Sequence, residues 1–164
     1  MTTCYPDSIK VKRDIQRRIE DHVIKYCETL EENFKQYSLR SFERNIDKPT
    51  EVSKGYTSYY EEQLQKIEDG TENLYKFVYK TGKKFHKVYF LEYKEKCDYY
   101  NRPAGYTAGS VHCFIDKKTG EVYKAASWKA PAKIVRFDLR LIGDREFLFN
   151  PNNISWAGSH LYLR

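Results

Sequence analysis

The sequence predicts an α+β protein in which a long N-terminal amphipathic helix and a second helix pack on a small antiparallel β-sheet of about four to five strands. Two observations predict this class. Apolar residues recur at every third or fourth position in the first 70 residues, whereas aromatic and β-branched runs separated by glycine-containing turns follow from residue 73. A length of 164 residues fits a single domain, with a helical part at 1–70 and a β-rich, basic part at 71–164.

The first helix is expected over residues 8–38. Either Asp7 or Ser8 is suited to cap its N-terminus. An apolar stripe of this length must pack on the sheet of the same chain or on a second copy of the helix, so we also expect a homo-oligomer, a dimer or higher. The stripe is made up of Ile15, Ile19, Val23, Tyr26, Leu30, Phe34 and Tyr37.

A second helix is expected over residues 50–68, because its tyrosines and apolar residues share one side and Asp69-Gly70 is a typical helix end. Residues 73–80 and 84–93 are then rich in aromatic and β-branched side chains, and Thr81-Gly82-Lys83 separates them. This pattern predicts a β-hairpin.

A second hairpin is expected from residues 110–116 and 121–125. The intervening Asp116-Lys-Lys-Thr-Gly120 is typical of a type I turn that is closed by a left-handed glycine.

The last part of the chain is less regular. Pro131 indicates a loop over residues 127–132. Residues 134–141 fit either a strand or a helical turn, since apolar and charged side chains alternate there. Residues 156–163 are expected to form a closing strand.

The net charge of +6 is unevenly distributed. Residues 1–70 hold 12 basic and 14 acidic residues, residues 71–108 hold 8 and 4, and residues 109–164 hold 9 and 5. The positive excess therefore lies in the second half, which favours an anionic partner there. No apolar run approaches the roughly 18 residues that a membrane span needs, so no membrane partner is expected.

The segment KAASWKAPAKIVR, from Lys124 to Arg136, contains four cations and no acid. Lysine and arginine suit phosphate oxygens, and Trp128 offers a flat face to a nucleobase. In the alternative interpretation, Trp128 packs against the sheet edge and the lysines are only solvated. The candidate ligand-binding residues are Lys124, Ser127, Trp128, Lys129, Lys133, Arg136, His112, Tyr123 and Arg140.

Residues suited to catalysis or metal binding are few. If residues 110–116 form a strand, His112 shares a face with Phe114 and points away from Cys113, so the two neighbours are not a base and a nucleophile. The histidines lack metal-ligand spacing, and no G-x-x-x-x-G-K-[ST], G-x-G-x-x-G, H-E-x-x-H or G-x-S-x-G motif occurs. We expect no catalytic residues, no metal and no cofactor, and the balance of the sequence favours a protein that is not an enzyme.

The cysteines form no C-x-x-C pair, and we expect them to be reduced thiols of a cytoplasmic protein rather than a disulfide or a metal site. They are Cys4, Cys27, Cys97 and Cys113.

Two segments resemble a protein family. Residues 110–136, SVHCFIDKKTGEVYKAASWKAPAKIVR, contain a strand, a D-x-x-T-G turn, the core K-x-A-S-W-K-A-P-A-K and an arginine. Residues 156–164, WAGSHLYLR, add a late W-x-G-x-x-L-Y. This combination resembles small uncharacterised proteins that bacteriophages and environmental viruses encode. The resemblance does not include the N-terminal helices. It implies a phage-type protein that acts in the cytoplasm of a bacterial host, and it brings no established activity.

Three functions follow as alternatives. The first, which we expect, is non-enzymatic binding of a phosphorylated nucleotide, for example to sequester a cyclic-nucleotide or ADP-ribose signal of host immunity as an anti-defence protein. The second is binding of single-stranded or structured nucleic acid, which the basic, aromatic second half favours. The third is inhibition of a host enzyme by protein interaction, with the tyrosines as interface anchors.

Overall fold

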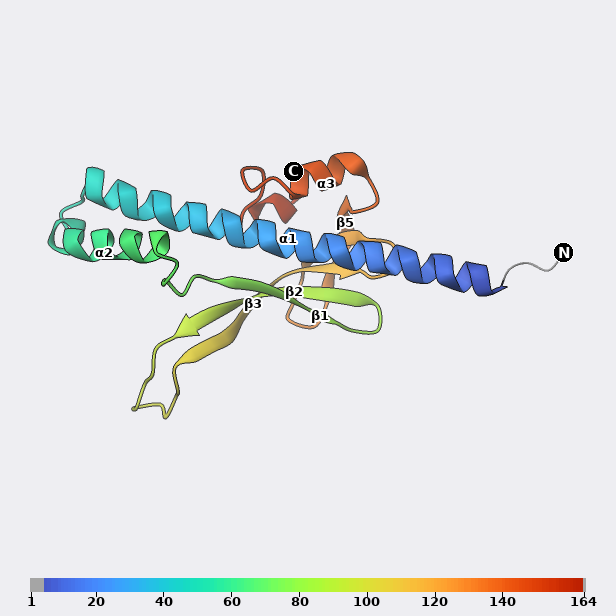
Figure 1. The fold of residues 1–164 in the computed structure, drawn as a ribbon, viewed down its shortest axis with the longest axis horizontal. Helices are drawn as coiled ribbons and strands as arrows, with labels where there is room; N and C mark the ends of the chain where they lie inside the picture. Colours follow the sequence, from blue (N-terminus) through green and yellow to red (C-terminus); the bar gives the residue numbers. More distant parts are fainter. Residues whose placement is uncertain (1–4, 164) are drawn as a thin grey trace.

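A computed structural model describes residues 5–163 and confirms the α+β class. The five strands follow one another in an antiparallel meander in the order β1-β2-β3-β4-β5. Figure 1 shows the long helix α1 crossing one face of this sheet, with α2 folded back beside its C-terminal end. The elements are α1 (Tyr5–Asp47), the 3-10 helix η1 (Ser53–Tyr56), α2 (Thr57–Glu68), β1 (Lys76–Thr81), β2 (Phe85–Lys94), β3 (Gly105–Asp116), β4 (Glu121–Ala125), β5 (Pro131–Asp138), α3 (Ile142–Leu148) and the 3-10 helix η2 (Ser159–Leu161).

Helix α1 is longer than predicted at both ends. It begins at Tyr5, so Asp7 and Ser8 lie inside the helix and the predicted cap is wrong. At the other end it continues to Asp47 and stops before Pro49, whose ring disfavours helical backbone at the preceding residue. The extension past residue 38 packs on α2, where the rings of Phe42 and Tyr60 lie 6.0 Å apart.

The core lies between the middle of α1 and the sheet. The centre of the predicted stripe is fully buried, whereas its ends, Ile15 and Tyr37, stay 43% and 47% exposed. Side chains from every strand and from the C-terminal part complete the core, because one apolar stripe can cover only part of a twisted sheet. The buried hydrophobic residues include Ile19, Val23, Tyr26, Leu30, Phe77, Val88, Cys113, Ile115, Val122, Leu139, Leu148 and Leu161.

A β-bulge in β3 changes the direction of one predicted site residue. Val88 pairs with Cys113 and Tyr89 with Val111, so His112 is an extra residue in the ladder. As a result His112 and Cys113 are both buried. The sequence predicted that His112 shares a face with Phe114 and points away from Cys113. Both predictions are wrong, because strict alternation of side chains fails at a bulge.

The hairpins are confirmed, but the C-terminal part differs from the prediction. Gly120 closes the Asp116 turn with a φ of +76°, and its N–H donates to the Asp116 carbonyl at 2.8 Å. The ambiguous segment 134–141 is a strand as far as Asp138, where β5 ends, and the unpredicted helix α3 follows. Because β5 begins at Pro131, the end of the predicted loop over residues 127–132 belongs to this strand. The predicted closing strand at 156–163 is wrong, because this segment forms a left-handed turn at Gly158 and then η2.

Gly109 on β3 is packed directly beneath the ring of Phe90. A Cβ added there would lie 2.6 Å from both Cδ2 and Cζ of Phe90, whereas a Cβ on Gly143 in α3 would meet nothing within 4 Å. We expect Gly109→Ala to lower the free energy of unfolding by about 1–3 kcal/mol through overpacking. Gly143→Ala is the matched control and should be neutral or slightly stabilising, since alanine favours a helix. Urea denaturation of both variants checks this, and equal stability would contradict the close packing.

Candidate functional site

The basic stretch predicted as a binding loop is a β-hairpin, formed by β4, β5 and the turn between them. The N–H groups of Ala126 and Ser127 both donate to the Ala130 carbonyl, at 3.0 and 3.1 Å. The Ser127 hydroxyl accepts hydrogen bonds from the N–H groups of Lys129 and Ala130. Ser127 therefore stabilises the turn. The strands on either side send their side chains to opposite faces of the sheet.

One group of predicted residues lies on the outer face, meaning the face of the sheet that points away from α1. Trp128 folds back onto this face, with its ring 5.6 Å from that of Tyr89. The Lys87 Nζ lies 4.6 Å above the Trp128 ring and donates to the Trp128 carbonyl at 3.0 Å. Trp128 still has 44% of its surface exposed, so its packing on the sheet leaves one side accessible.

Four further predicted residues also lie away from the inner side of the sheet. The Tyr123 hydroxyl donates to Glu121 at 2.6 Å, and the Tyr123 ring lies 5.8 Å from that of Phe85. Lys129 and Lys133 are exposed, at the hairpin turn and on β5 respectively. Arg140 is engaged in an ion pair with Asp138, at 2.7 Å, and lies 3.6 Å from Glu121.

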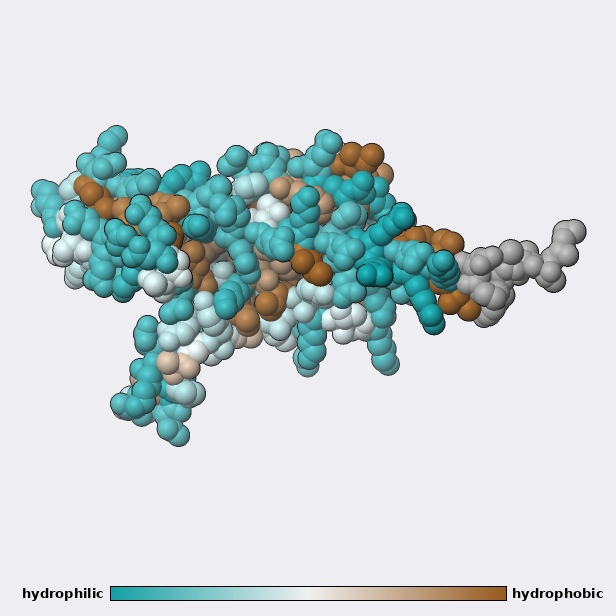
Figure 2. Space-filling view, in the orientation of Figure 1, coloured by the Kyte–Doolittle hydropathy of each residue, from teal (hydrophilic) through white to brown (hydrophobic). Residues whose placement is uncertain are grey.

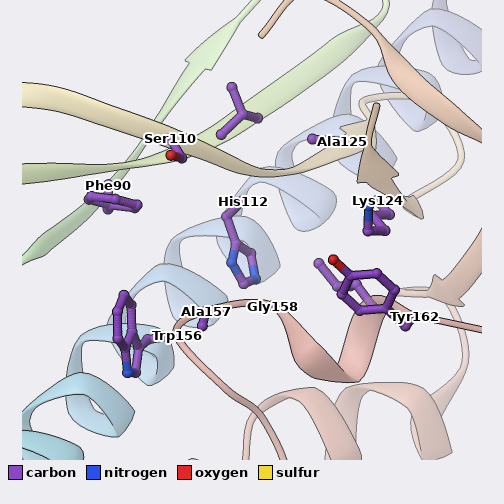
Figure 3. A pocket seen from close by; sticks show the side chains of 11 residues that line it. Phe90, Ser110, His112, Lys124, Ala125, Trp156, Ala157, Gly158 and Tyr162 are labelled. Atoms are coloured by element: carbon purple, nitrogen blue, oxygen red, sulfur yellow. The ribbon is translucent and has the colours of Figure 1, made fainter. Parts of the chain in front are cut away.

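A second group lines a pocket on the inner side of the sheet, which we call the Lys124 pocket. Its volume is about 320 Å³. Figure 3 shows His112 pointing from β3 toward Ala157 and Gly158, with Trp156 on one side of it and Lys124 and Tyr162 on the other. The Lys124 Nζ lies 4.6 Å from the centre of the Tyr162 ring. The residues around the pocket are Phe90, Ser110, Val111, His112, Lys124, Ala125, Trp156, Ala157, Gly158, Leu161 and Tyr162.

A neighbouring pocket of about 540 Å³, the Arg136 pocket, lies on the other side of η2 and shares Tyr162 with the first. A second bulge turns Arg136 inward, because Val122 pairs with Phe137 while Tyr123 pairs with Val135. The Arg136 Nε donates to the Leu161 carbonyl at 2.6 Å, so this arginine also holds the C-terminal segment. The other residues that line the Arg136 pocket include Phe137, Phe147, Asn152, Asn153, Ser155, Ser159 and His160.

Asn33 on α1 holds the start of the segment that separates the two pockets. Its Nδ2 donates to the carbonyls of Pro151 and Ile154, both at 2.9 Å. Its Oδ1 accepts a hydrogen bond from the Trp156 N–H at 2.8 Å. The sequence analysis missed Asn33, because a lone asparagine in a helix carries no signal until its partners more than a hundred residues away are known.

A buried tyrosine connects the two pockets. The Tyr26 oxygen lies 2.8 Å from Nε2 of His112 in the Lys124 pocket and 2.6 Å from Nε2 of His160 in the Arg136 pocket. The Ser155 N–H donates to Nδ1 of His160, so the proton of that neutral ring is on Nε2 and is donated to the Tyr26 oxygen. Tyr26 then donates its own proton to Nε2 of His112.

The environment of this group favours the neutral form of each member. Burial, reinforced by the nearby His160, lowers the pKa of His112 to about 3. Burial also lowers the pKa of His160 to about 4. Burial raises the pKa of Tyr26 well above its usual value. All three are therefore uncharged near neutral pH, and the only charged side chains that line the two pockets are Lys124 and Arg136.

Other candidate centres are not assembled in the part of the chain that the structure describes. Within it, no three His, Cys, Asp or Glu side chains gather closely enough to hold a metal ion. Cys27, Cys97 and Cys113 are free thiols, and Cys4 lies outside the described residues. Burial raises the pKa of Cys27 to about 12, which leaves it protonated and a poor nucleophile.

Comparison with known proteins identifies a family. The model of a family of unknown function, DUF7717, matches residues 3–163. The chain belongs to DUF7717. Comparisons with curated proteins and with solved structures find no match.

The DUF7717 match extends well beyond the two segments whose resemblance was noted from the sequence. It includes α1, which supplies Tyr26 and Asn33, and the bulged strand β3, which supplies His112. All four fixed residues of the late W-x-G-x-x-L-Y pattern, Trp156, Gly158, Leu161 and Tyr162, line the Lys124 pocket. Within residues 5–163, no helix of this DUF7717 chain has the length and apolarity that a membrane crossing requires.

Proposed function

We propose that this protein binds a small phosphorylated nucleotide at the Lys124 and Arg136 pockets and does not chemically alter it. The observation that supports this most directly is the charge of the lining. Each pocket has one cation, and neither has an aspartate or glutamate among its lining residues. Their volumes, about 320 and 540 Å³, are in the range of small-molecule sites.

The side chains around the cations suit the other parts of a nucleotide. Trp156 and Tyr162 in the Lys124 pocket offer flat faces to a base, and the Lys124 ammonium beside Tyr162 suits a phosphate. Asn152 and Asn153 in the Arg136 pocket offer amide donors and acceptors to a sugar or a second phosphate. A ligand with two phosphates would be able to contact both cations across the shared Tyr162.

Sequestration, rather than turnover, is supported by the state of the two histidines. Each Nε2 is hydrogen-bonded to Tyr26, and burial keeps both rings neutral. Neither ring nitrogen that contacts Tyr26 is therefore free to act on a ligand. Together with the resemblance to phage-type proteins, this favours a protein that removes a cyclic-nucleotide or ADP-ribose signal from the host cytoplasm.

The test is a thermal-shift panel of purified protein with cyclic AMP, cyclic di-AMP, cyclic GMP–AMP, ADP-ribose and inorganic phosphate. We expect one nucleotide to stabilise the protein, by about 2.7 kcal/mol at a hundredfold excess over its Kd. Lys124→Met should weaken that ligand by about 10- to 100-fold, the loss expected for a hydrogen bond to a charged group. Lys133→Met, an exposed lysine outside both pockets, is the control. A panel with no stabilised member, or equal effects of the two variants, would count against the proposal.

We also propose that the chain self-associates through the N-terminal part of α1. In Figure 1 this end of the helix extends beyond the sheet. Val11 and Ile15 on it are 55% and 43% exposed, and their spacing of four residues places them side by side on the helix as an apolar surface for a second copy of the chain. Light scattering on the wild type and on Ile15→Glu tests this, and a monomeric wild type would refute it.

A further inference from the structure

The outer face of the sheet has a composition that the pocket proposal does not explain. Strand register identifies this face: Lys87 pairs with Phe114 and Tyr89 with Val78, while the alternate residue Val88 belongs to the core. Aromatic side chains recur across it, on the three central strands β2, β3 and β4 and on the hairpin turn. They are Phe85, Tyr89, Tyr93, Tyr106, Tyr123 and Trp128.

These rings form pairs rather than isolated contacts. Trp128 lies 5.6 Å from Tyr89, and Tyr93 lies 5.4 Å from Tyr106. All four are at least partly exposed, so none of these rings is simply part of the core. Exposed, edge-to-face aromatic pairs on a sheet provide flat surfaces on which unstacked bases are able to lie.

Lysines are placed beside these rings without acidic partners. The Nζ atoms of Lys87 and Lys76 lie 4.6 and 4.5 Å from the ring centres of Trp128 and Tyr106. Lys80 stands directly opposite Lys87 in the β1–β2 ladder, an arrangement of like charges that destabilises a sheet. Among the described residues none of these three lysines lies within ion-pair distance of an acid. An anion between them would relieve the repulsion.

The acids of the outer face do not cancel this charge. Asp116, opposite Phe85, is buried and accepts hydrogen bonds from the N–H groups of Lys118 and Thr119. Glu121 and Asp138 face each other at one corner of the sheet, where Arg140 lies 3.6 and 2.7 Å from them. The rest of the face is free of α1, which covers the opposite side (Figure 1). In Figure 2 teal and near-white residues predominate along the lower edge of the molecule, with some brown residues among them.

We propose that the outer face of the sheet binds single-stranded nucleic acid. Bases would stack on Trp128 and Tyr89, and the backbone phosphates would run past Lys87 and Lys80. A duplex is a poorer fit, because its bases are already stacked and are out of reach of a flat sheet. This site is independent of the nucleotide pockets, since they open on the other side of the sheet and share none of these residues.

The experiment is fluorescence anisotropy of the full chain with fluorescein-labelled oligo-U and oligo-dT of about 12 nucleotides and a duplex of the same length. We expect both single strands to bind more tightly than the duplex. Comparing the affinities for oligo-U and oligo-dT shows whether RNA or DNA is preferred. Trp128→Ala should weaken binding by about 5- to 150-fold, the loss that corresponds to one stacked base. Tyr56→Ala, at an aromatic on η1 that is 57% exposed, is the control and should have no effect.

Salt dependence provides a second readout that does not need the tryptophan variant to fold. Lys87→Gln and Lys80→Gln should each reduce the slope of log K against log salt by about 0.7, as expected for one phosphate contact on a single strand. Lys35→Gln, an exposed lysine on α1, should leave the slope unchanged. Absence of binding near physiological salt, equal affinity for duplex, or unchanged slopes in both lysine variants would overturn the proposal. A dimer that Trp128→Ala dissociates, without oligonucleotide binding, would assign the face to a second copy of the chain instead.

Discussion

Acidification from pH 7 to pH 5 is expected to destabilise the protein by about 2–4 kcal/mol through the histidines that Tyr26 holds. In the folded state the pKa values of His112 and His160 are lowered to about 3 and about 4, chiefly by burial. In the unfolded chain both would titrate near the ordinary value of about 6.5. Between these limits the unfolded state binds more protons than the folded state, so stability falls as the pH falls below about 6.5.

The size of this effect depends on the number of histidines that share the buried site. Each contributes at most about 1.4 kcal/mol per pH unit within its window, which ends near pH 4 for His160 and near pH 3 for His112. Urea denaturation at several pH values between 5 and 7 measures the slope where most carboxylates remain ionised. His160→Gln should remove about half of it, whereas His22→Gln, at a half-buried ring away from Tyr26, should remove much less. A flat profile between pH 5 and 7 would show that the two rings are not buried in the neutral form.

The sequence was sufficient to predict the fold class because its signals are local. The helical stripe and the hairpin turns depend on residues that are close together in the chain, and the Asp116–Gly120 turn was recognised from its composition alone. The C-terminal segment was misassigned because its conformation is set by distant partners. Asn33, Tyr26 and Arg136 fix it through side chains whose roles have no local signature.

The candidate site was only partly predictable for the same reason. The sequence grouped Lys124, Trp128 and Arg136 by their proximity in the chain, but a hairpin separates near neighbours onto two faces. Lys124 and Arg136 turn inward while Trp128 lies on the outer face, and the inward turn of Arg136 depends on a bulge. No composition rule predicts the position of a single inserted residue. The two proposed binding surfaces therefore share one charged segment that was expected to form one site.

Asn33→Ala is the single substitution that we expect to affect the pocket architecture most. The change deletes all three hydrogen bonds to the 151–156 segment and leaves the Trp156 N–H without its acceptor. We expect a loss of about 2–4 kcal/mol in the free energy of unfolding, since buried groups left unpaired cost about 1–3 kcal/mol each. Asn45→Ala, also on α1, removes only one local bond to the Ser41 carbonyl and is the matched control.

Hydrogen exchange distinguishes the proposed cause from general destabilisation. If Asn33 acts by holding the C-terminal segment, the amides of residues 156–162 should exchange faster in Asn33→Ala, while those of the β1–β2 hairpin should be less affected. The Lys124 and Arg136 pockets would then lose a shared wall, because Trp156, Tyr162 and His160 all belong to the released segment. Nucleotide binding should weaken when this wall is lost, whereas oligonucleotide binding on the outer face should persist in the folded fraction. Equally faster amide exchange throughout the sheet would instead show that Asn33 stabilises the whole fold. It would contradict a specific role of Asn33 in holding the pocket walls.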